Sequence, residues 1–211
     1  MHALSVGECI SFAWETFKKR PWLLIGAVLL AIVISSLPSL FGPQAHFDPD
    51  GKLVPPPVTP AYVIASLASV VISIYVALGL ATFSLRAHDN IETAQIADLW
   101  NPAPFWRFLG AHILTAIAVG LGFIALVVPG IIIAVGLEFV PYVVIERGLG
   151  PIDSIKEAWQ ITKGHKWQLF LLLLALLGLN FLGAVALVIG LLVTIPISLL
   201  ALAHAYRTLT R

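Results

Sequence analysis

Long runs of apolar residues constrain this chain more than any other feature of its sequence. A helix needs about 20 mostly apolar residues to cross the hydrocarbon core of a bilayer. The last run is about twice that length, so it is expected to form two helices. The runs therefore predict an all-α, polytopic membrane protein with six transmembrane helices arranged as three hairpins. The five runs are Trp22–Phe41, Ala61–Leu85, Phe108–Val128, Ile131–Ile145 and Leu169–Tyr206.

The composition also favours a membrane protein over a soluble domain with a large core. Of the 211 residues, 59% are hydrophobic and 11% are charged, whereas soluble domains are about half apolar and about a quarter charged. A net charge of +1 gives no basic field for nucleic acid, so no such partner is expected. The single cysteine, Cys9, excludes an internal disulfide and a cysteine-based zinc cluster. We expect its thiol to be inert.

Glycine, proline and asparagine residues mark where the spans should be connected. Pro129–Gly130 divides the third and fourth runs, because proline removes a helix donor and the pair favours a turn. Within the last run the preferred place to turn is Gly178, Asn180 and Gly183, with Gly190 as the alternative. The fourth run is short for a span, so a re-entrant pair is the alternative to full crossings by spans three and four.

The first apolar run resembles a signal peptide in only one respect. Lys18, Lys19 and Arg20 precede it, as basic residues precede a signal's apolar region. However, about twenty residues come first, and Trp22–Phe41 is longer than the roughly 7–15 apolar residues of a signal peptide. We therefore expect a retained span, followed by an external proline-rich loop at residues 42–60.

The lysine and arginine residues predict how the six spans are oriented. In a six-span arrangement all of them except Lys52 fall on one side of the membrane. Cytoplasmic segments are enriched in these residues, so both termini are expected in the cytoplasm. An odd number of spans would scatter the basic residues over both faces. Those on the cytoplasmic side are Lys18, Lys19, Arg20, Arg86, Arg107, Arg147, Lys156, Lys163, Lys166, Arg207 and Arg211.

Each cytoplasmic segment is expected to contain a short amphipathic helix before a transmembrane hairpin. Asn90 can cap the second of these helices, and Pro151 suits the first turn of the third. Such helices either lie in the headgroup region or pack under the bundle as structural caps. The expected apolar faces are Val6, Ile10, Ala13 and Phe17 in the first, Ile91, Ile96, Leu99 and Trp100 in the second, and Ile152, Ile155 and Trp159 in the third.

The three segments also share one sequence pattern, which occurs at Ile10–Trp22, Ile96–Phe108 and Ile155–Trp167. Each copy has isoleucine, then a small or apolar residue, then tryptophan, and finally another aromatic residue at the same spacing. This predicts three copies of one unit within a single membrane domain, at about residues 1–86, 87–147 and 148–211. The simpler alternative is that any helix entering a bilayer has an interfacial aromatic. In both cases the expected interfacial anchors are Trp14, Trp22, Trp100, Trp159 and Trp167.

Residues 129–170 carry a recognisable family pattern, PGIIIAVGLEFVPYVVIERGLGPIDSIKEAWQITKGHKWQLF. It resembles bacterial membrane proteins of the YciC and DUF975 type, which are related to the membrane domain fused to some glycerophosphodiester phosphodiesterases. The resemblance covers most of the chain and implies a six-span protein of the bacterial inner membrane. It brings no catalytic residues, and Glu138 is not part of the family pattern.

The sequence shows no catalytic constellation and no cofactor motif. Gly148 and Gly150 form no phosphate loop, since the lysine and hydroxyl residue of that loop are missing. The histidines lack metal-ligand spacing on one helix. We expect a non-enzymatic protein without a cofactor, acting as an accessory or scaffold subunit or as a lipid-interacting factor. Its expected partners are membrane lipids and either other membrane subunits or further copies of itself.

Glu138 is the one acidic residue well inside an expected span, which makes it the candidate polar site. An acidic residue at the bilayer centre costs roughly 2.5 to 3.5 kcal/mol on translocon scales, so it should face protein. Its expected partners are Asn180 or Thr194, a water-filled cavity, or another subunit. The alternative function is a small repeat-built transporter or permease subunit with a midplane site near Glu138.

Overall fold

The computed structural model describes residues 4–41, 46–48, 51–54, 56, 58–100, 104–186 and 189–210. Within these ranges six helical segments are long and apolar enough to cross a membrane. This confirms the predicted multi-pass helical membrane protein. Consecutive spans pack in pairs, α2 with α3, α4 with α5, and α8 with α9.

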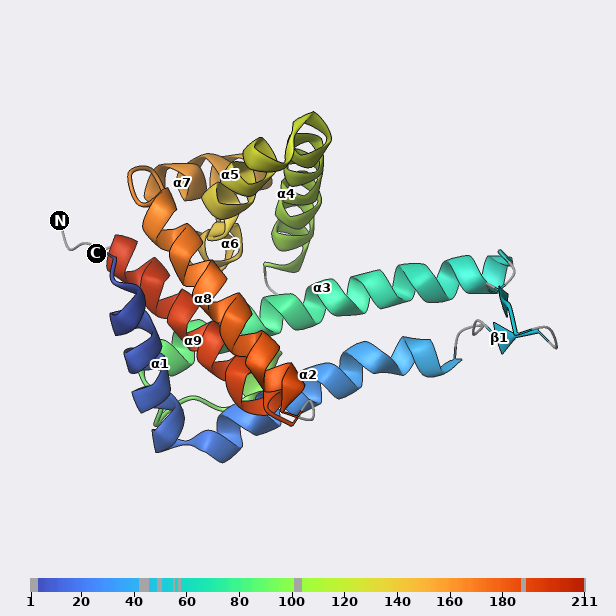
Figure 1. Ribbon diagram of the computed structural model, residues 1–211, viewed down its shortest axis with the longest axis horizontal. Helices are drawn as coiled ribbons and strands as arrows, with labels where there is room; N and C mark the ends of the chain where they lie inside the picture. The colour runs from blue at the N-terminus through green and yellow to red at the C-terminus, as the bar shows by residue number, and fades with distance from the viewer. Residues whose placement is uncertain are drawn as a thin grey trace.

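The first spans form a long pair that extends away from the other helices and ends at a small β-hairpin (Figure 1). Helix α1 (Val6–Lys19) begins at Ser5, whose hydroxyl accepts from the Glu8 amide, and α2 is Pro21–Phe41. The strands β1 (His46–Phe47) and β2 (Leu53–Val54) pair antiparallel. Helix α3 (Pro60–Asp89) begins with proline after a Thr59 cap, a position where proline loses no helical bond.

The second pair of spans contains a break. After the 3₁₀ helix η1 (Ile96–Leu99), α4 is Phe105–Ala125 and α5 is Val127–Leu137. A short α6 (Val140–Arg147) then completes the fourth span, and it ends at Gly148, where a left-handed backbone with φ of 60° favours glycine. The last third of the chain is α7 (Pro151–Ile161), α8 (Lys166–Val185) and α9 (Leu191–Thr210).

The turn between spans three and four lies before the predicted Pro129–Gly130. Leu126 is extended and separates α4 from α5, while Pro129 is the third residue of α5. Proline is tolerated there because the first amides of a helix have no intrahelical partner. Gly130 serves packing instead, since a Cβ there would lie 2.6 Å from the Phe123 ring of α4.

The turn within the last apolar run, in contrast, was predicted too early in the sequence. Helix α8 continues through Gly178, Asn180 and Gly183 to Val185, and the connection precedes α9 near the alternative position, Gly190. The two helices approach closely here, because a Cβ on Gly190 would lie 2.5 Å from the Gly183 carbonyl oxygen. Glycine therefore marks a close helix crossing as well as a turn.

The predicted second amphipathic helix is a turn and the four-residue η1. Asn90 accepts a hydrogen bond from the Glu92 amide, which fixes a turn instead of starting a helix. The Arg20 guanidinium then donates to the carbonyls of Ile91, Glu92 and Ala94, at 2.9 to 3.2 Å. These carbonyls are satisfied by a distant arginine, so the segment needs no helical hydrogen bonds.

The buried face of α7 also differs from the predicted one. Ile152 is 62% exposed, and the fully buried positions are Ser154, Ala158 and Thr162. These small residues let α7 approach α4 and α6 closely. In α1 the predicted Ala13 and Phe17 are buried, together with Cys9 and Thr16, which lie beside them on the same face.

The core lies where α3, α6 and α9 meet, which are the helices that end the second span of each pair. Helix α3 packs on both α9 and α6. Tyr206 connects α9 to the beginning of α6, because its ring lies 5.6 Å from Phe139 and 5.3 Å from Tyr142. All three rings are buried. The ends of α3, α6 and α9 thus converge at one place.

Candidate functional site

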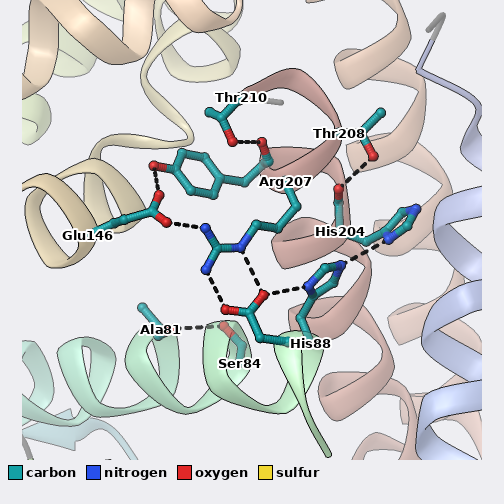
Figure 2. Close-up of polar contacts among 10 residues, drawn as sticks. Ala81, Ser84, His88, Glu146, His204, Arg207, Thr208 and Thr210 are labelled. Carbon is teal, nitrogen blue, oxygen red and sulfur yellow. Dashed lines mark hydrogen bonds and ion pairs between the residues drawn. The ribbon is translucent and has the colours of Figure 1, made fainter.

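Arg207 lies at the centre of the convergence of α3, α6 and α9 (Figure 2). Its Nε donates to Asp89 Oδ1 at 3.0 Å, and its Nη2 donates to Asp89 Oδ2 at 2.5 Å. Its Nη1 donates to Glu146 at the end of α6. One planar guanidinium thereby joins the last turns of three helices, with a bidentate pair that is among the strongest hydrogen bonds in proteins. We call Asp89, Glu146 and Arg207 the ion cluster.

Tyr206 adds an uncharged connection beside the ion cluster. Its hydroxyl donates to Glu146 Oε2 at 2.6 Å. The same ring stacks on Tyr142 within the core. Glu146 is therefore held by two neighbouring residues of α9, and its carboxylate has both oxygens in use.

A histidine pair extends the ion cluster toward α1. His88 lies 3.1 Å from Asp89 Oδ1 through Nδ1, and its Nε2 lies 3.1 Å from His204 Nδ1. Phe12 of α1 packs on both imidazoles, with ring centroids 4.7 and 4.2 Å away. A hydrogen bond between two imidazole nitrogens needs one N–H and one lone pair. This contact therefore requires that His88 or His204 be unprotonated at the facing nitrogen.

A polar cavity of about 460 Å³ opens at the ion cluster. It is lined by Asp89, Glu146, Arg147, Arg207 and Thr210. The Arg207 side chain is 20% exposed and the two carboxylates are 33% and 49% exposed, so water reaches the cluster. Arg147 pairs with Glu157 of α7, which continues the charge network onto a fourth helix. The arrangement suits mechanical connection, because each charged group named here already has a partner within the fold.

Glu138 lies in the two-residue break between α5 and α6. The break follows from Pro141, which has no N–H to continue the hydrogen-bond ladder and disfavours helix before it. Thr162 of α7 covers the freed backbone, with its hydroxyl 3.0 Å from the Gly136 carbonyl oxygen. Within the described ranges, the Glu138 side chain makes no hydrogen bond or ion pair.

The structure does not bring the three predicted polar residues together. Asn180 donates to Ser198 of α9 at 2.8 Å, and the Thr194 hydroxyl is buried beside Gly183. Both therefore belong to the α8–α9 contact. Glu138 lies next to Phe139, whose ring meets Tyr206, twelve residues and about 18 Å along α9 from Thr194. Neither Asn180 nor Thr194 is its partner.

The predicted interfacial tryptophans share one property, which is that each is exposed, by 38% for Trp159 to 84% for Trp22. Trp159 has a specific environment in addition. Its ring covers Gly136, where a Cβ would lie 2.5 Å away, and Lys166 Nζ lies 2.9 Å from the ring centroid. This is a cation–π contact. The exposed rings are Trp14, Trp22, Trp100, Trp159 and Trp167.

Sequence reasoning missed the ion cluster and the histidine pair. The positive-inside pattern placed Arg207 and the end of α3 on the same side of the membrane, and this was the available signal. It could not show that Asp89 and Glu146 lie on either side of one guanidinium, because that depends on how three distant helices meet.

Comparisons with known proteins identify the family of this chain. Uncharacterised proteins of Mycobacterium tuberculosis strain H37Rv and of Mycobacterium bovis are each 26% identical to this chain over 224 residues, covering 98% of the chain and 69% of the relative. No solved structure matches. These relatives provide no link to the membrane domain of glycerophosphodiester phosphodiesterases. Residues 62–211 match the family described as "Protein of unknown function (DUF975)", and the chain therefore belongs to the DUF975 family.

Proposed function

We propose that the protein is a non-enzymatic protein of the bacterial inner membrane that acts as a scaffold and binds membrane lipids. The observation that carries the proposal is the ion cluster. Arg207, Asp89 and Glu146 use their charges to hold α3, α6 and α9 together. The charged groups that connect the helices pair with one another, so they stabilise the helix bundle and are not available to act on a substrate. This favours a scaffold over an enzyme.

The outer surfaces of the spans support the lipid part of the proposal. Large apolar side chains such as Ile64, Ile117 and Leu177 are exposed along α3, α4 and α8. In a bilayer these side chains face acyl chains. The sequence predicts that the basic residues gather on one side, which favours both termini in the cytoplasm next to anionic headgroups.

The three-unit organisation belongs to the same proposal. Ala13, Leu99 and Ala158 occupy the same position of the repeated pattern, and all three are buried. The tryptophan that follows each of them is exposed. Equal burial at equal positions supports three copies of one unit, each with its leading segment under the helices and its tryptophan at the interface.

Lipid retention tests the proposed function. The protein would be exchanged from its membrane into detergent and purified, and the lipid that remains bound would be counted by mass spectrometry. We expect a constant number of lipids per chain and a higher melting temperature in lipid nanodiscs than in micelles. A protein that loses all lipid and melts at the same temperature in both media would contradict the proposal.

A small transporter is the second candidate, favoured by one observation. Glu138 lies in a break within a span, and broken helices form substrate and ion sites in repeat-built transporters. Proton flux into proteoliposomes under a membrane potential would test it. A flux that Glu138→Gln abolishes without changing the melting temperature would support transport. A flux equal to that of protein-free liposomes would exclude a proton pathway, and Glu138→Leu would then test a packing role through stability alone.

A further inference from the structure

A groove separates the second pair of spans from the third. Its volume is about 500 Å³, within the range of about 300 to 1,000 Å³ that is usual for ligand pockets. The wall from α5 is aliphatic, and the wall from the first turns of α8 is aromatic with one lysine. The residues that matter here are Val128, Ile132 and Val135 on α5 and Lys166, Trp167 and Phe170 on α8.

Lys166 is the one charged group on the groove wall, and no carboxylate pairs with it within the described ranges. Its ammonium lies over the Trp159 ring, which orients the group without neutralising its charge. Lys163 adds a second exposed positive charge in the preceding turn. Helix α8 also begins without a side-chain cap, so the positive end of its dipole lies at the same place.

We propose that the α5–α8 groove binds one anionic phospholipid, with an acyl chain along α5 and its phosphate at Lys166. The proposal rests on the proposed lipid-binding function and specifies its site. An apolar groove that ends in an unpaired cation is complementary to a molecule with a long apolar chain and a negative head. A free phosphate would leave the aliphatic wall exposed, and an apolar helix of another protein would leave the Lys166 charge unpaired.

The placement of Lys166 fits this occupant. Lys166 belongs to the basic residues that the sequence assigns to the cytoplasmic side. Basic pockets between helices on that side are the kind of site that binds anionic headgroups. Val128 lies seven residues from Val135, or about 10 Å farther along α5, so the aliphatic wall leads from this end into the membrane.

The test compares headgroups and variants in the full chain. Native mass spectrometry would count lipids bound to protein released from nanodiscs of phosphatidylcholine with phosphatidylglycerol. We expect wild type to retain one phosphatidylglycerol, and Lys166→Gln to bind it about fivefold more weakly, the equivalent of about 1 kcal/mol for one basic residue. Lys166→Arg keeps the charge and should keep binding. Lys156→Gln, an exposed lysine on α7 that pairs loosely with Asp153, is the matched control.

A second pair of variants tests the apolar wall. Ile132→Trp fills the groove and should remove the bound lipid, whereas Ile124→Trp, at a site on α4 that is 82% exposed, should not. If Ile132→Trp fails to fold, the Lys166→Gln and Lys166→Arg pair decides alone.

The outcomes separate this site from the general function. Retention of lipid without headgroup preference, unchanged by Lys166→Gln or Ile132→Trp, would overturn the groove as the site but leave the proposed lipid-binding function intact. Loss of all lipid from wild type would overturn both. Loss of phosphatidylglycerol preference in Lys166→Gln but not in Lys156→Gln would establish the groove.

Discussion

Arg207 is the residue through which the ends of three helices depend on one another. Removing its guanidinium would leave Asp89 and Glu146 facing each other across the cavity without a counter-charge. A hydrogen bond to a charged group contributes about 1.5 to 3 kcal/mol. Because water reaches both carboxylates, screening lowers the expected cost.

We expect Arg207→Ala to lower the free energy of unfolding by about 1–2 kcal/mol, measured by thermal or denaturant unfolding in detergent. Arg207→Lys should recover only part of this, since an ammonium cannot form the planar bidentate contact. Lys18→Ala is the control, because Lys18 forms an exposed pair with Glu15. If Arg207→Ala melts like wild type, the ion cluster does not hold the helices together.

Cys9 provides a second prediction at the residue scale. The thiol is buried on the face of α1 that packs against α9. Burial, followed by the nearby Glu8 carboxylate, raises the pKa of the Cys9 thiol from its ordinary value of 9.0 to about 11. The thiol therefore stays protonated and shielded at neutral pH.

We expect Cys9 to react with a maleimide at neutral pH only after the chain is unfolded in strong detergent. The raised pKa also stabilises the folded state, because folding disfavours the thiolate. This stabilisation is complete below pH 9.0, decreases as the pH rises from there, and is lost near pH 11. Cys9→Ala should remove this alkaline sensitivity. Rapid labelling of the folded protein would show that α1 does not stay packed on α9.

At the scale of single elements, some prolines and glycines predicted the helix boundaries correctly and others did not. Pro151 was placed in the first turn of its helix, and α7 begins there. Pro129 and Gly178 were assigned to turns, but both lie within helices. Proline is as typical of the first turn of a helix as of a loop, and glycine is as typical of a close helix crossing as of a turn. The position of the neighbouring helix distinguishes these cases, and the local sequence pattern does not give that position.

The apolar runs predicted the spans well because hydrophobic length is a local property. The residues of α7 that pack on the protein were harder to predict. The expected apolar face contains the large Ile152, which is exposed, whereas small residues such as Ser154 and Ala158 are buried. In a bilayer large apolar side chains can face lipid without cost, and small residues let helix backbones approach. The usual association of size with burial therefore fails in this environment.

Gly136 tests this packing rule. A Cβ at this position would lie 2.5 Å from the Trp159 ring and 3.4 Å from Lys166 Nζ, which lies over the same ring. We expect Gly136→Ala to destabilise the protein by about 1–3 kcal/mol through overpacking. Gly120→Ala in the second half of α4 is the matched control, since nothing lies within 4 Å of its Cβ position. That change should be neutral or stabilising by up to about 1 kcal/mol. Equal melting temperatures for the two variants would contradict the close α5–α7 contact.

For the whole molecule, the leading segments contact the three proposed units in a closed order. The η1 segment packs on α3 of the first unit, and α7 packs on α6 of the second. Helix α1 packs on α9 of the third, so the first unit contacts the last (Figure 1). The helices that end the second span of each pair, α3, α6 and α9, meet at the ion cluster. The proposed repeated unit, packed on its predecessor, would account for both the recurring sequence pattern and the position of the cluster.

This arrangement requires that the three leading segments lie on one side of the membrane and the β-hairpin on the other. Glu92 lies beside η1 and is exposed, and Lys52 lies in the hairpin and is exposed. We would introduce Glu92→Cys or Lys52→Cys into a Cys9→Ala chain and label intact cells with a membrane-impermeant maleimide. Lys52→Cys should react from outside, and Glu92→Cys should react only after the inner membrane is permeabilised.

The expected orientation follows from the basic residues, eleven of which share the side of Glu92 in a six-span chain. Labelling of Glu92→Cys but not Lys52→Cys in intact cells would show that the protein has the opposite orientation. Labelling of both residues from outside would show that the chain has one span fewer than six. In that case α1, η1 and α7 would not share one side of the membrane, and the contacts with their neighbouring units would not be possible.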